Sequence, residues 1–333
     1  MSVPTEAPPS TPTFLELEIT SRCQLTCTHC YAESGPTGDH GTMNGDEWRR
    51  VLSEAAELGV HTVQFIGGEP TLHPEFAELL GYALGVGLRV EVYSNLYRLG
   101  AKEWALLERP GVGLATSYYS DDPAEHDAIT SRTGSHARTR ANIAEAVRRG
   151  IALRVGIIHM HEGQRSEQAR AELEALGVER VSVDRVRGVG NAAGALLPST
   201  SALCGRCADG IAAILPDGTV APCVMGRFLP AGHVQGTSLA RVFTSPRWHQ
   251  VAASIPRAKR GCVPQSCTPG EDSCQPSPGA VASPAHAGQC PPTCDPANCE
   301  PSDTDSCGPR GNEPCPPMSE VARLPERAGR ERT

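Results

Sequence analysis

Six short runs rich in apolar residues recur along the first 190 residues of the chain. Most of them are followed by a stretch with helical apolar spacing, and such stretches end at a glycine, as many helices do. The clearest helices predicted in this way cover Gly45–Leu58, Pro74–Leu84 and Arg138–Arg149. The strands predicted from the apolar runs cover Phe14–Thr20, His61–Ile66, Leu88–Ser94, Val112–Ser117, Leu153–Ile158 and Arg180–Val186.

The alternation of strands and helices predicts an α/β fold with a parallel sheet. The pattern leaves open whether this sheet curls into a partial or full barrel or stays open as a doubly wound sheet. In each of these folds, ligands bind at the carboxyl ends of the strands. Functional residues are therefore expected in the loops that follow the strands.

The character of the chain changes twice beyond these strands and helices. The glycine-rich segment Gly188–Gly194 is interpreted as a linker into a smaller region. We expect a flexible N-terminus at 1–12, the strand–helix domain at 13–195, the smaller region at 196–260 and a Cys/Pro-rich tail at 261–333. Between Cys262 and Cys315 the tail has no Phe, Trp, Tyr, Leu, Ile or Met, so it is expected to be disordered or held only by its cysteines.

Charge and composition narrow the possible functions. The chain carries 30 basic and 38 acidic side chains, which gives a formal net charge of -8 and argues against binding to nucleic acid or an anionic membrane. It has no run of 18 apolar residues and no signal peptide pattern, so a soluble, cytoplasmic protein is expected. In that reducing compartment, the 14 cysteines are expected to be metal ligands or reactive thiols rather than disulfides.

Three of these cysteines lie together directly after the first predicted strand. Cys23, Cys27 and Cys30 have the spacing C-x3-C-x2-C. Three thiolates from one loop can bind three irons of a 4Fe-4S cluster and leave the fourth iron open for another ligand. A zinc knuckle with His29 as the fourth ligand is the alternative, but four tetrahedral ligands from so short a loop are awkward. The spacing favours the cluster.

With His29 before the last cysteine, this motif resembles the C-x3-C-x-φ-C signature of the radical SAM superfamily, where φ is an aromatic ring residue. The resemblance implies a partial (β/α)6 TIM-like barrel. It also implies that the open iron binds S-adenosylmethionine (SAM), whose reductive cleavage gives a 5′-deoxyadenosyl radical. An external electron donor of the flavodoxin or ferredoxin type would be needed.

A second motif follows the second strand. Gly67-Gly68-Glu69-Pro70 resembles the family's GGEP motif, in which the backbone and the glutamate meet the amino group of the cofactor's methionine. Paired glycines permit a close backbone approach, and a carboxylate accepts hydrogen bonds from an ammonium group. An ordinary Gly-Gly turn is the alternative. Its position after the second strand favours cofactor binding by Gly67, Gly68 and Glu69.

Weaker resemblances follow the next strands. Ser94-Asn95 stands where relatives often carry Thr-Asn-Gly before the ribose, although Leu96 replaces the glycine. Ser117, followed by Asp121, resembles a Ser-x-Asp region that contacts the nucleoside in relatives, with longer spacing here. The segment 155–158 matches a strand that lies against the adenine in the family, but an ordinary buried strand is the favoured interpretation.

A second cysteine group lies in the smaller region. Cys204-x2-Cys207-x10-Gly218-x4-Cys223 resembles the first half of a SPASM/Twitch extension, whose cysteines bind an auxiliary 4Fe-4S cluster. Residues 216–218, Pro-Asp-Gly, predict a hairpin turn between strands at 212–215 and 219–222. A zinc ribbon is the alternative. We favour Cys204, Cys207 and Cys223 as cluster ligands.

The tail does not continue the SPASM spacing. Each of its eight cysteines, from Cys262 to Cys315, is followed two residues later by proline, which favours extended polyproline conformation. The sequence leaves open the fourth auxiliary ligand and the number of auxiliary clusters. It also leaves open whether the tail is an incidental thiol-rich segment or serves cluster ligation, iron–sulfur delivery or coverage of the active site.

The resemblance covers residues 13–260 and points to radical chemistry more specifically than to a substrate. Relatives with such extensions mostly modify peptides by cross-linking, thioether formation or epimerisation, so a peptide-maturing enzyme is predicted. A small-molecule radical enzyme of antibiotic or other secondary metabolism is the alternative. A non-catalytic iron–sulfur scaffold would not need Gly67-Gly68-Glu69. Since no winged-helix module precedes the barrel, a separate protein is expected to recognise a leader peptide.

Overall fold

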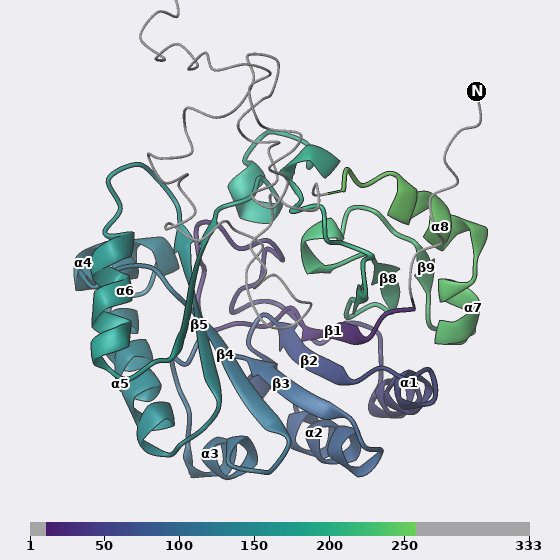
Figure 1. The fold of residues 1–333 in the computed structure, drawn as a ribbon, viewed down its shortest axis with the longest axis horizontal. Coiled ribbons are helices and arrows are strands. Elements are labelled where there is room, and N and C mark those ends of the chain that lie inside the picture. The colour runs from purple at the N-terminus through teal and green to yellow at the C-terminus, as the bar shows by residue number, and fades with distance from the viewer. Residues whose placement is uncertain (1–10, 258–333) are drawn as a thin grey trace, which may run out of the picture. The chain divides into compact units, whose positions relative to one another are not determined.

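The computed structural model describes residues 11–257, whose strands form one sheet in the order β6-β5-β4-β3-β2-β1-β7-β8-β9. The strands β1 to β6 pair in parallel, as the sequence predicts, and the sheet curls with helices packed along its outer side (Figure 1). The partial TIM-like barrel is therefore confirmed. The strands are β1 (Phe14–Thr20), β2 (Thr62–Gly67), β3 (Arg89–Tyr93), β4 (Val112–Tyr118), β5 (Leu153–His159), β6 (Arg180–Arg185), β7 (Ile211–Ile214), β8 (Thr219–Ala221) and β9 (Gly232–His233).

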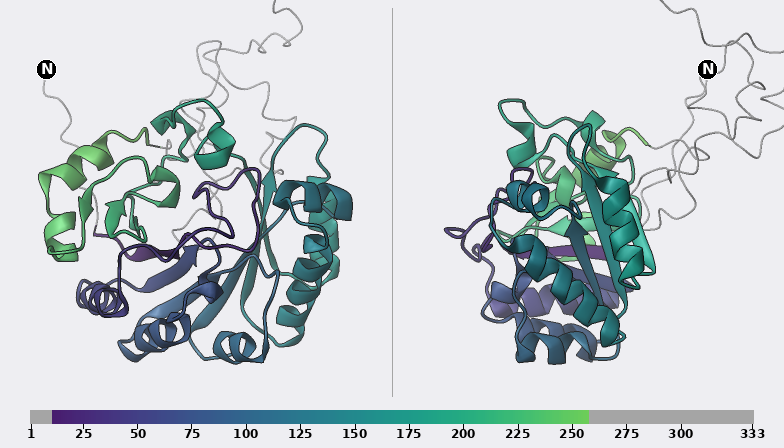
Figure 2. Two further views of the ribbon diagram at one scale, coloured as in Figure 1. Left: turned by 180° about the vertical axis from the view of Figure 1, so that it is seen from behind. Right: turned by 90° about the vertical axis from the view of Figure 1, so that its left-hand side faces the viewer.

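Helices follow each of the first five strands and run back along the sheet, which is the arrangement that parallel pairing requires (Figure 2). The helices are α1 (Gly45–Glu57), α2 (Phe76–Gly85), α3 (Ala101–Leu107), α4 (Pro123–Thr130), α5 (Ser135–Arg148), α6 (Ser166–Ala175), α7 (Leu239–Phe243) and α8 (Pro246–Ala253). The first helix begins at a capping box, in which Asn44 and Glu47 bond each other's backbone N–H groups. The predicted strand and helix ends agree with the observed ones within a few residues.

Strand β1 shows how the sequence separates the two faces of the sheet. Successive side chains of a strand point to opposite faces. Leu15, Leu17 and Ile19 enter the main core between sheet and helices, and all three are fully buried. Glu16 and Glu18 therefore point to the other face, the inside of the curled sheet. A parallel strand buried on both faces is normally apolar throughout, so these carboxylates mark a functional interior.

The segment beyond residue 210 extends the barrel sheet. Strand β7 pairs in parallel with β1, and the antiparallel strands β8 and β9 continue the sheet from it. The predicted hairpin is confirmed, with Gly218 at φ +89° in its turn. Ile214 and Trp248 belong to the same apolar core as the residues of β1. The boundary predicted near residue 195 remains a prediction.

The predicted tail and its C-x-P repeats, with Cys262 to Cys315, lie outside the described residues, as do residues 1–10. Between residues 11 and 257, no helix combines the length and the apolar character needed to cross a membrane.

Because Ile214 of β7 is fully buried in the shared core, Ile214→Ala should lower the free energy of unfolding by about 2–5 kcal/mol. Chemical denaturation followed by circular dichroism should show one transition at a lower denaturant concentration. Leu196→Ala, at a side chain 78% exposed, is the control and should change stability by less than about 0.5 kcal/mol. Two separate transitions, with only one of them shifted by Ile214→Ala, would show that β7 is not part of the barrel core.

Candidate functional site

One cavity of about 330 Å³ reaches both cysteine groups of the described chain. Its wall includes residues of the loop after β1, the ends of β2 to β6 and the segments around β7 and β8. The predicted site residues that line it are Cys23, Cys27, Cys30, Gly67, Gly68, Asn95, Ser117, Cys204, Cys207 and Cys223. The structure thus brings together residues that lie up to 200 positions apart in the sequence.

The first cysteine loop is held by backbone hydrogen bonds on several sides. The Cys23 N–H donates to the Gly35 carbonyl at 3.0 Å, and the Thr28 N–H donates to the Ile129 carbonyl at 2.9 Å. On a third side, Asn191 donates to the carbonyls of Cys27 and Cys30 at 3.0 and 2.9 Å. The positions of the cysteine Cα atoms are therefore set by the surrounding fold.

The sulfur atoms of this loop accept hydrogen bonds from nearby N–H groups. Cys23 Sγ accepts from the Leu25 N–H at 3.4 Å and from Asn95 Nδ2 at 3.5 Å, and Cys30 Sγ accepts from the Ser34 N–H at 3.3 Å. Such donors stabilise the negative charge of sulfur ligands and tune an iron–sulfur cluster. The loop thus already directs N–H donors at two of the three sulfur atoms.

Cys23, Cys27 and Cys30 are free thiols, and burial makes the ionisation of Cys23 and Cys27 unfavourable. Burial raises the pKa of Cys23 to about 12 and raises that of Cys27 as well. A thiolate here therefore requires a nearby positive charge, which bound iron would supply. The donor set fits an iron–sulfur cluster.

The zinc alternative has less support from the geometry. Among residues 11–257, no three His, Cys, Asp or Glu side chains converge where one metal ion could bind them. His29 Nδ1 is buried without a hydrogen-bond partner among the described residues, and its ring lies edge-on to Tyr119 at 5.0 Å. A four-iron cluster is larger than one zinc ion, so its ligands stand further apart. The preference for a cluster over zinc therefore rests on the spacing of the motif.

The two glycines after β2 allow close contact with the chain that leads into the cysteine loop. The Gly68 N–H donates to the Thr20 carbonyl at 2.7 Å, and the Glu69 N–H donates to the Arg22 carbonyl at 2.8 Å. A Cβ atom on Gly67, where φ is +136°, would collide with the Thr20 carbonyl, and one on Gly68 would collide with that of Arg22. The absence of side chains at Gly67 and Gly68 thus lets the glycine turn pack against the chain that leads into the cysteine loop. Both glycines also line the cavity.

Glu69 lies beside this turn but does not line the cavity. Its side chain is 1% exposed, and burial raises the pKa of its carboxyl group. One carboxylate oxygen accepts from Ser94 Oγ and the Asn95 N–H at 3.0 and 2.9 Å, and the other accepts from Thr71 Oγ1 at 2.7 Å. The structure therefore shows Glu69 fixing the end of β3, and its contact with the cofactor remains a prediction.

The turn after β3 places Asn95 in the lining of the cavity, whereas Ser94 is buried and does not line it. Leu96 adopts φ +54°, the left-handed conformation that favours glycine, although it is fully buried. The Asn142 side chain donates to the Leu96 carbonyl at 2.6 Å and helps to hold this turn. The turn thus forms despite the leucine where relatives often have glycine.

Ser117 and its neighbours form the wall contributed by β3 to β5. Ser117 lines the cavity and is 2.9 Å from the Tyr93 hydroxyl. Gly156 and Ile158 of β5 line the cavity as well. Asp121 is absent from that lining, and its carboxylate forms a two-point ion pair with Arg165 at 2.6 and 2.8 Å.

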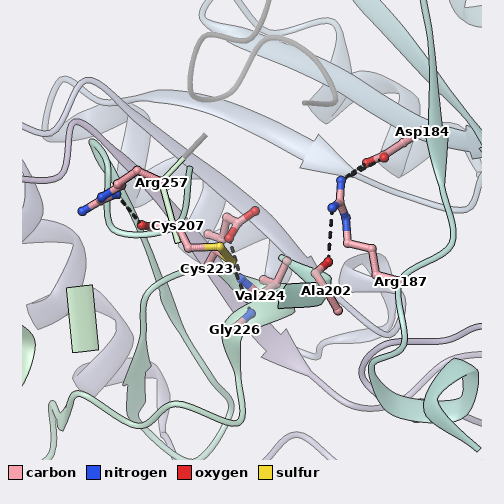
Figure 3. The surroundings of a disulfide bond; sticks show 9 residues. Asp184, Arg187, Ala202, Cys207, Cys223, Val224, Gly226 and Arg257 are labelled. Carbon is pink, nitrogen blue, oxygen red and sulfur yellow. Dashed lines mark hydrogen bonds and ion pairs between the residues drawn. A yellow bond between two sulfur atoms is a disulfide. The ribbon is translucent and has the colours of Figure 1, made fainter. Parts of the chain in front are cut away.

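The second cysteine group also faces the cavity. Cys207 and Cys223 are joined as a disulfide (Figure 3). The expectation of cysteines without disulfides is therefore wrong for this pair, because the pairing of β7 with β8 brings their Cα atoms to 5.2 Å, within disulfide range. Cys223 Sγ also accepts from the Gly226 N–H at 3.2 Å, and Arg257 donates to the Cys207 carbonyl at 3.0 Å. Since only thiolates bind iron, both cysteines would have to be reduced to act as ligands. Their proximity, together with Cys204 on the same wall, fits a shared auxiliary cluster.

Sequence interpretation missed a polar layer inside the barrel. Glu16, Gln64 and Glu91 are directly paired neighbours on β1, β2 and β3, so their side chains point to one face. Arg154 of β5 binds Glu91 in a two-point ion pair at 2.7 and 2.8 Å. Burial raises the pKa of Glu16 to about 8. The signal was available, because charged residues interrupt the strands of a predicted parallel sheet, and such strands are normally apolar and buried on both faces.

Two family models match the chain. The model described as the radical SAM superfamily matches residues 17–176, and the iron–sulfur cluster-binding domain called SPASM matches residues 204–274. The second match includes Cys262, Cys267 and Cys274, which lie beyond the described residues.

The curated relatives are similar over part of their length. A PqqA peptide cyclase of Xanthomonas campestris pv. campestris is 34% identical over 202 residues, which cover 58% of this chain and 52% of the relative. A PqqA peptide cyclase of Rhodopseudomonas palustris is 33% identical over 128 residues, covering 38% and 34%. The chain thus spans about half or less of the length of these relatives.

Solved structures share the fold at low sequence identity. Streptococcus suis SuiB bound to the precursor peptide SuiA superimposes with a TM-score of 0.63 at 15% identity, over 76% of this chain and 69% of that one. Native anSMEcpe with bound AdoMet gives a TM-score of 0.57 at 13% identity, over 75% and 85%. The matched domains imply a 4Fe-4S cluster with SAM and auxiliary iron–sulfur binding. Residues 17–176 thus carry a radical SAM domain, and residues 204–274 carry a SPASM iron–sulfur cluster-binding domain.

Proposed function

We propose that this protein is an enzyme that cleaves SAM reductively and uses the radical to mature a ribosomally synthesised peptide. The observation that carries the proposal is the single cavity shared by the free thiols Cys23, Cys27 and Cys30, the Gly67-Gly68 turn and the second cysteine group. Such a cavity can hold a substrate between a radical source and a second redox centre.

The chain's own residues prepare this cavity for the cofactor. Cys23, Cys27 and Cys30 are the proposed ligands of the first cluster, and the N–H groups of Leu25 and Ser34 already point at two of their sulfurs. Bound together, the cluster and SAM supply a 5′-deoxyadenosyl radical that can abstract hydrogen from carbon. The remaining residues position the cofactor and limit the access of water.

The cofactor's position is proposed from the ends of the strands. The Gly67-Gly68 turn leaves backbone exposed to the methionine end, and Asn95 and Ser117 offer polar atoms to the ribose. Glu69 fixes the turn containing Asn95 and is proposed to face the methionine amino group once the cofactor is bound. Tyr119, 7% exposed, closes the wall near His29.

The proposal of a peptide substrate is supported by similar proteins that act on or bind peptides. The curated relatives are PqqA peptide cyclases, and the SuiB structure contains a precursor peptide. Cys204, Cys207 and Cys223 are the proposed ligands of an auxiliary cluster that can accept an electron from a substrate radical. A flavodoxin or ferredoxin type donor, a separate leader-peptide recognition protein and a cytoplasmic location complete the proposal.

The test uses the full chain, purified and reconstituted without oxygen, and short peptides encoded beside its gene. With reductant and SAM in deuterated water, mass spectrometry should detect 5′-deoxyadenosine and a peptide that has lost two hydrogen atoms or has gained deuterium at the Cα of an epimerised residue. Cys23→Ala, Cys27→Ala and Cys30→Ala should each abolish both products, because each variant loses one of three cluster ligands. Thr26→Ser, at an exposed position of the same loop, is the control.

Undiminished cofactor cleavage in any cysteine variant would contradict the first part of the proposal. Cleavage without modification of any such peptide, together with turnover of a small metabolite from neighbouring biosynthetic genes, would replace peptide maturation by small-molecule chemistry.

Glu69→Gln should weaken SAM binding by about 10- to 100-fold, because an amide cannot accept all the hydrogen bonds that converge on this carboxylate. Hydrogen bonds to a charged group contribute about 1.5–3 kcal/mol. Ser94→Ala, which removes one donor and leaves the carboxylate, should have a smaller effect. Glu78→Gln, on the exposed face of α2, is the control. The measurement is a binding titration at equal iron content, and an unchanged dissociation constant would remove Glu69 from the site.

Replacing Cys204 and Cys207 together by alanine should remove the auxiliary cluster and sharply lower substrate turnover. Cofactor cleavage without substrate should survive, because the proposed cofactor contacts, Gly67, Gly68, Asn95 and Ser117, all lie on the barrel. Iron per chain and low-temperature EPR of the reduced protein are the measurements. Iron content and spectra equal to those of the wild type would show that this cysteine group binds no cluster, and zinc or thiols would become the better interpretation.

A further inference from the structure

Two carboxylates of β1 hold the segment that follows Cys223. Glu16 accepts a hydrogen bond from the Val224 N–H at 2.7 Å. Glu18 accepts from Arg227 Nη1 with both oxygens, at 2.8 and 2.9 Å. The chain from Cys223 to Arg227 is therefore attached to the first barrel strand by side chains as well as through the sheet.

The Glu18–Arg227 ion pair is deeply placed. Glu18 is fully buried, and the Arg227 side chain is 25% exposed. Burying such a pair costs desolvation energy, and apolar side chains of similar size often stabilise a fold equally well. Stability is therefore a weak explanation for a charged pair at this position, and its location suggests a different role.

The segment that leads to Arg227 lies beside the loop of the first cysteine group. Tyr31, the residue after Cys30, packs against the same small apolar cluster as Met225, two residues before Arg227. Tyr31 lines the cavity, and its hydroxyl is buried without a hydrogen-bond partner among the described residues. Four residues before Arg227 in the sequence stands Cys223, which lines the same cavity. One arginine thus links the two proposed iron–sulfur sites.

We propose that Arg227, held by Glu18, is a positioning residue for both iron–sulfur sites, and that its charge raises the reduction potentials of the clusters. The inference rests on the proposed function, since it assigns clusters to both cysteine groups. Cluster potentials depend on nearby charge and hydrogen bonding. Reduction adds negative charge to a cluster, so a neighbouring cation stabilises the reduced form and a neighbouring carboxylate opposes it.

A role of the Arg227 charge and a role in packing alone predict different results when Arg227 or Glu18 is replaced. Arg227→Met removes the cation, so it should shift the potentials to more negative values. Glu18→Gln removes the carboxylate and leaves the cation, so it should shift them to more positive values. A role in packing alone would not produce shifts of opposite sign. Arg227→Lys keeps the charge and should restore most of the wild-type potential.

The experiment is an anaerobic redox titration of the full chain, followed by low-temperature EPR, with iron per chain measured for each variant. Arg89→Met, at an exposed arginine where β3 begins, is the control and should leave the potentials unchanged. If Arg227→Met fails to assemble one cluster, Glu18→Gln and Arg227→Lys still decide the question.

Shifts of opposite sign for Arg227→Met and Glu18→Gln would support the inference. Unchanged potentials in Glu18→Gln, or shifts of the same sign in both variants, would overturn it. A wild-type chain that assembles no clusters or does not cleave SAM would instead overturn the proposed function. The two failures are therefore distinguishable.

Discussion

Strand β1 pairs in parallel with β2 along one edge and with β7 along the other. The first pairing brings the cysteine loop after β1 beside the glycine turn after β2, where the Gly68 N–H bonds the Thr20 carbonyl. The second pairing brings the hairpin that carries Cys223 to the opposite side of the same strand. The cavity runs along the inner face of β1, where Phe14 and Glu16 line it, and so reaches from the loop after β1 to the segments beside the start of β7 that carry Cys207 and Cys223.

The inside of the barrel is polar where an ordinary parallel sheet would be apolar. Glu16, Glu18 and Glu91 lie on interior faces and are each bonded to an arginine or a backbone N–H. Buried charges are tolerated when they are paired and hydrogen-bonded. Fixed dipoles and ion pairs of this kind need no rearrangement when a charged cofactor or substrate enters.

Much of the fold was predictable because its signals are local. Apolar runs, helical spacing and terminal glycines identified the six barrel strands, and residues 216–218 identified the hairpin. Cys23, Cys27 and Cys30 were predictable as one group of proposed ligands because all three lie in one short loop. The glycines after β2 were predicted to let the backbone approach the cofactor closely. The structure shows that they also allow close contact with the backbone at Thr20.

Other features depend on contacts between distant parts of the chain. The pairing of β7 with β1 and the Glu18–Arg227 ion pair join residues about 200 positions apart, and no local pattern indicates such partners. Glu69 was predicted to face the cofactor, but its hydrogen bonds to Ser94 and the Asn95 backbone could be found only from the folded chain. The charged residues within the strands did signal a functional interior, without indicating what each of them binds.

On the proposed function, Cys23, Cys27 and Cys30 would hold a cluster whose open iron binds the methionine end of SAM. Electron nuclear double resonance on the reduced holoenzyme, with SAM labelled at its amino nitrogen, measures whether the cluster and the cofactor are in contact. Hyperfine coupling between the labelled nitrogen and the cluster is the predicted result. Bound SAM without such coupling would show that this cluster does not hold the cofactor and would contradict the assignment of the cavity.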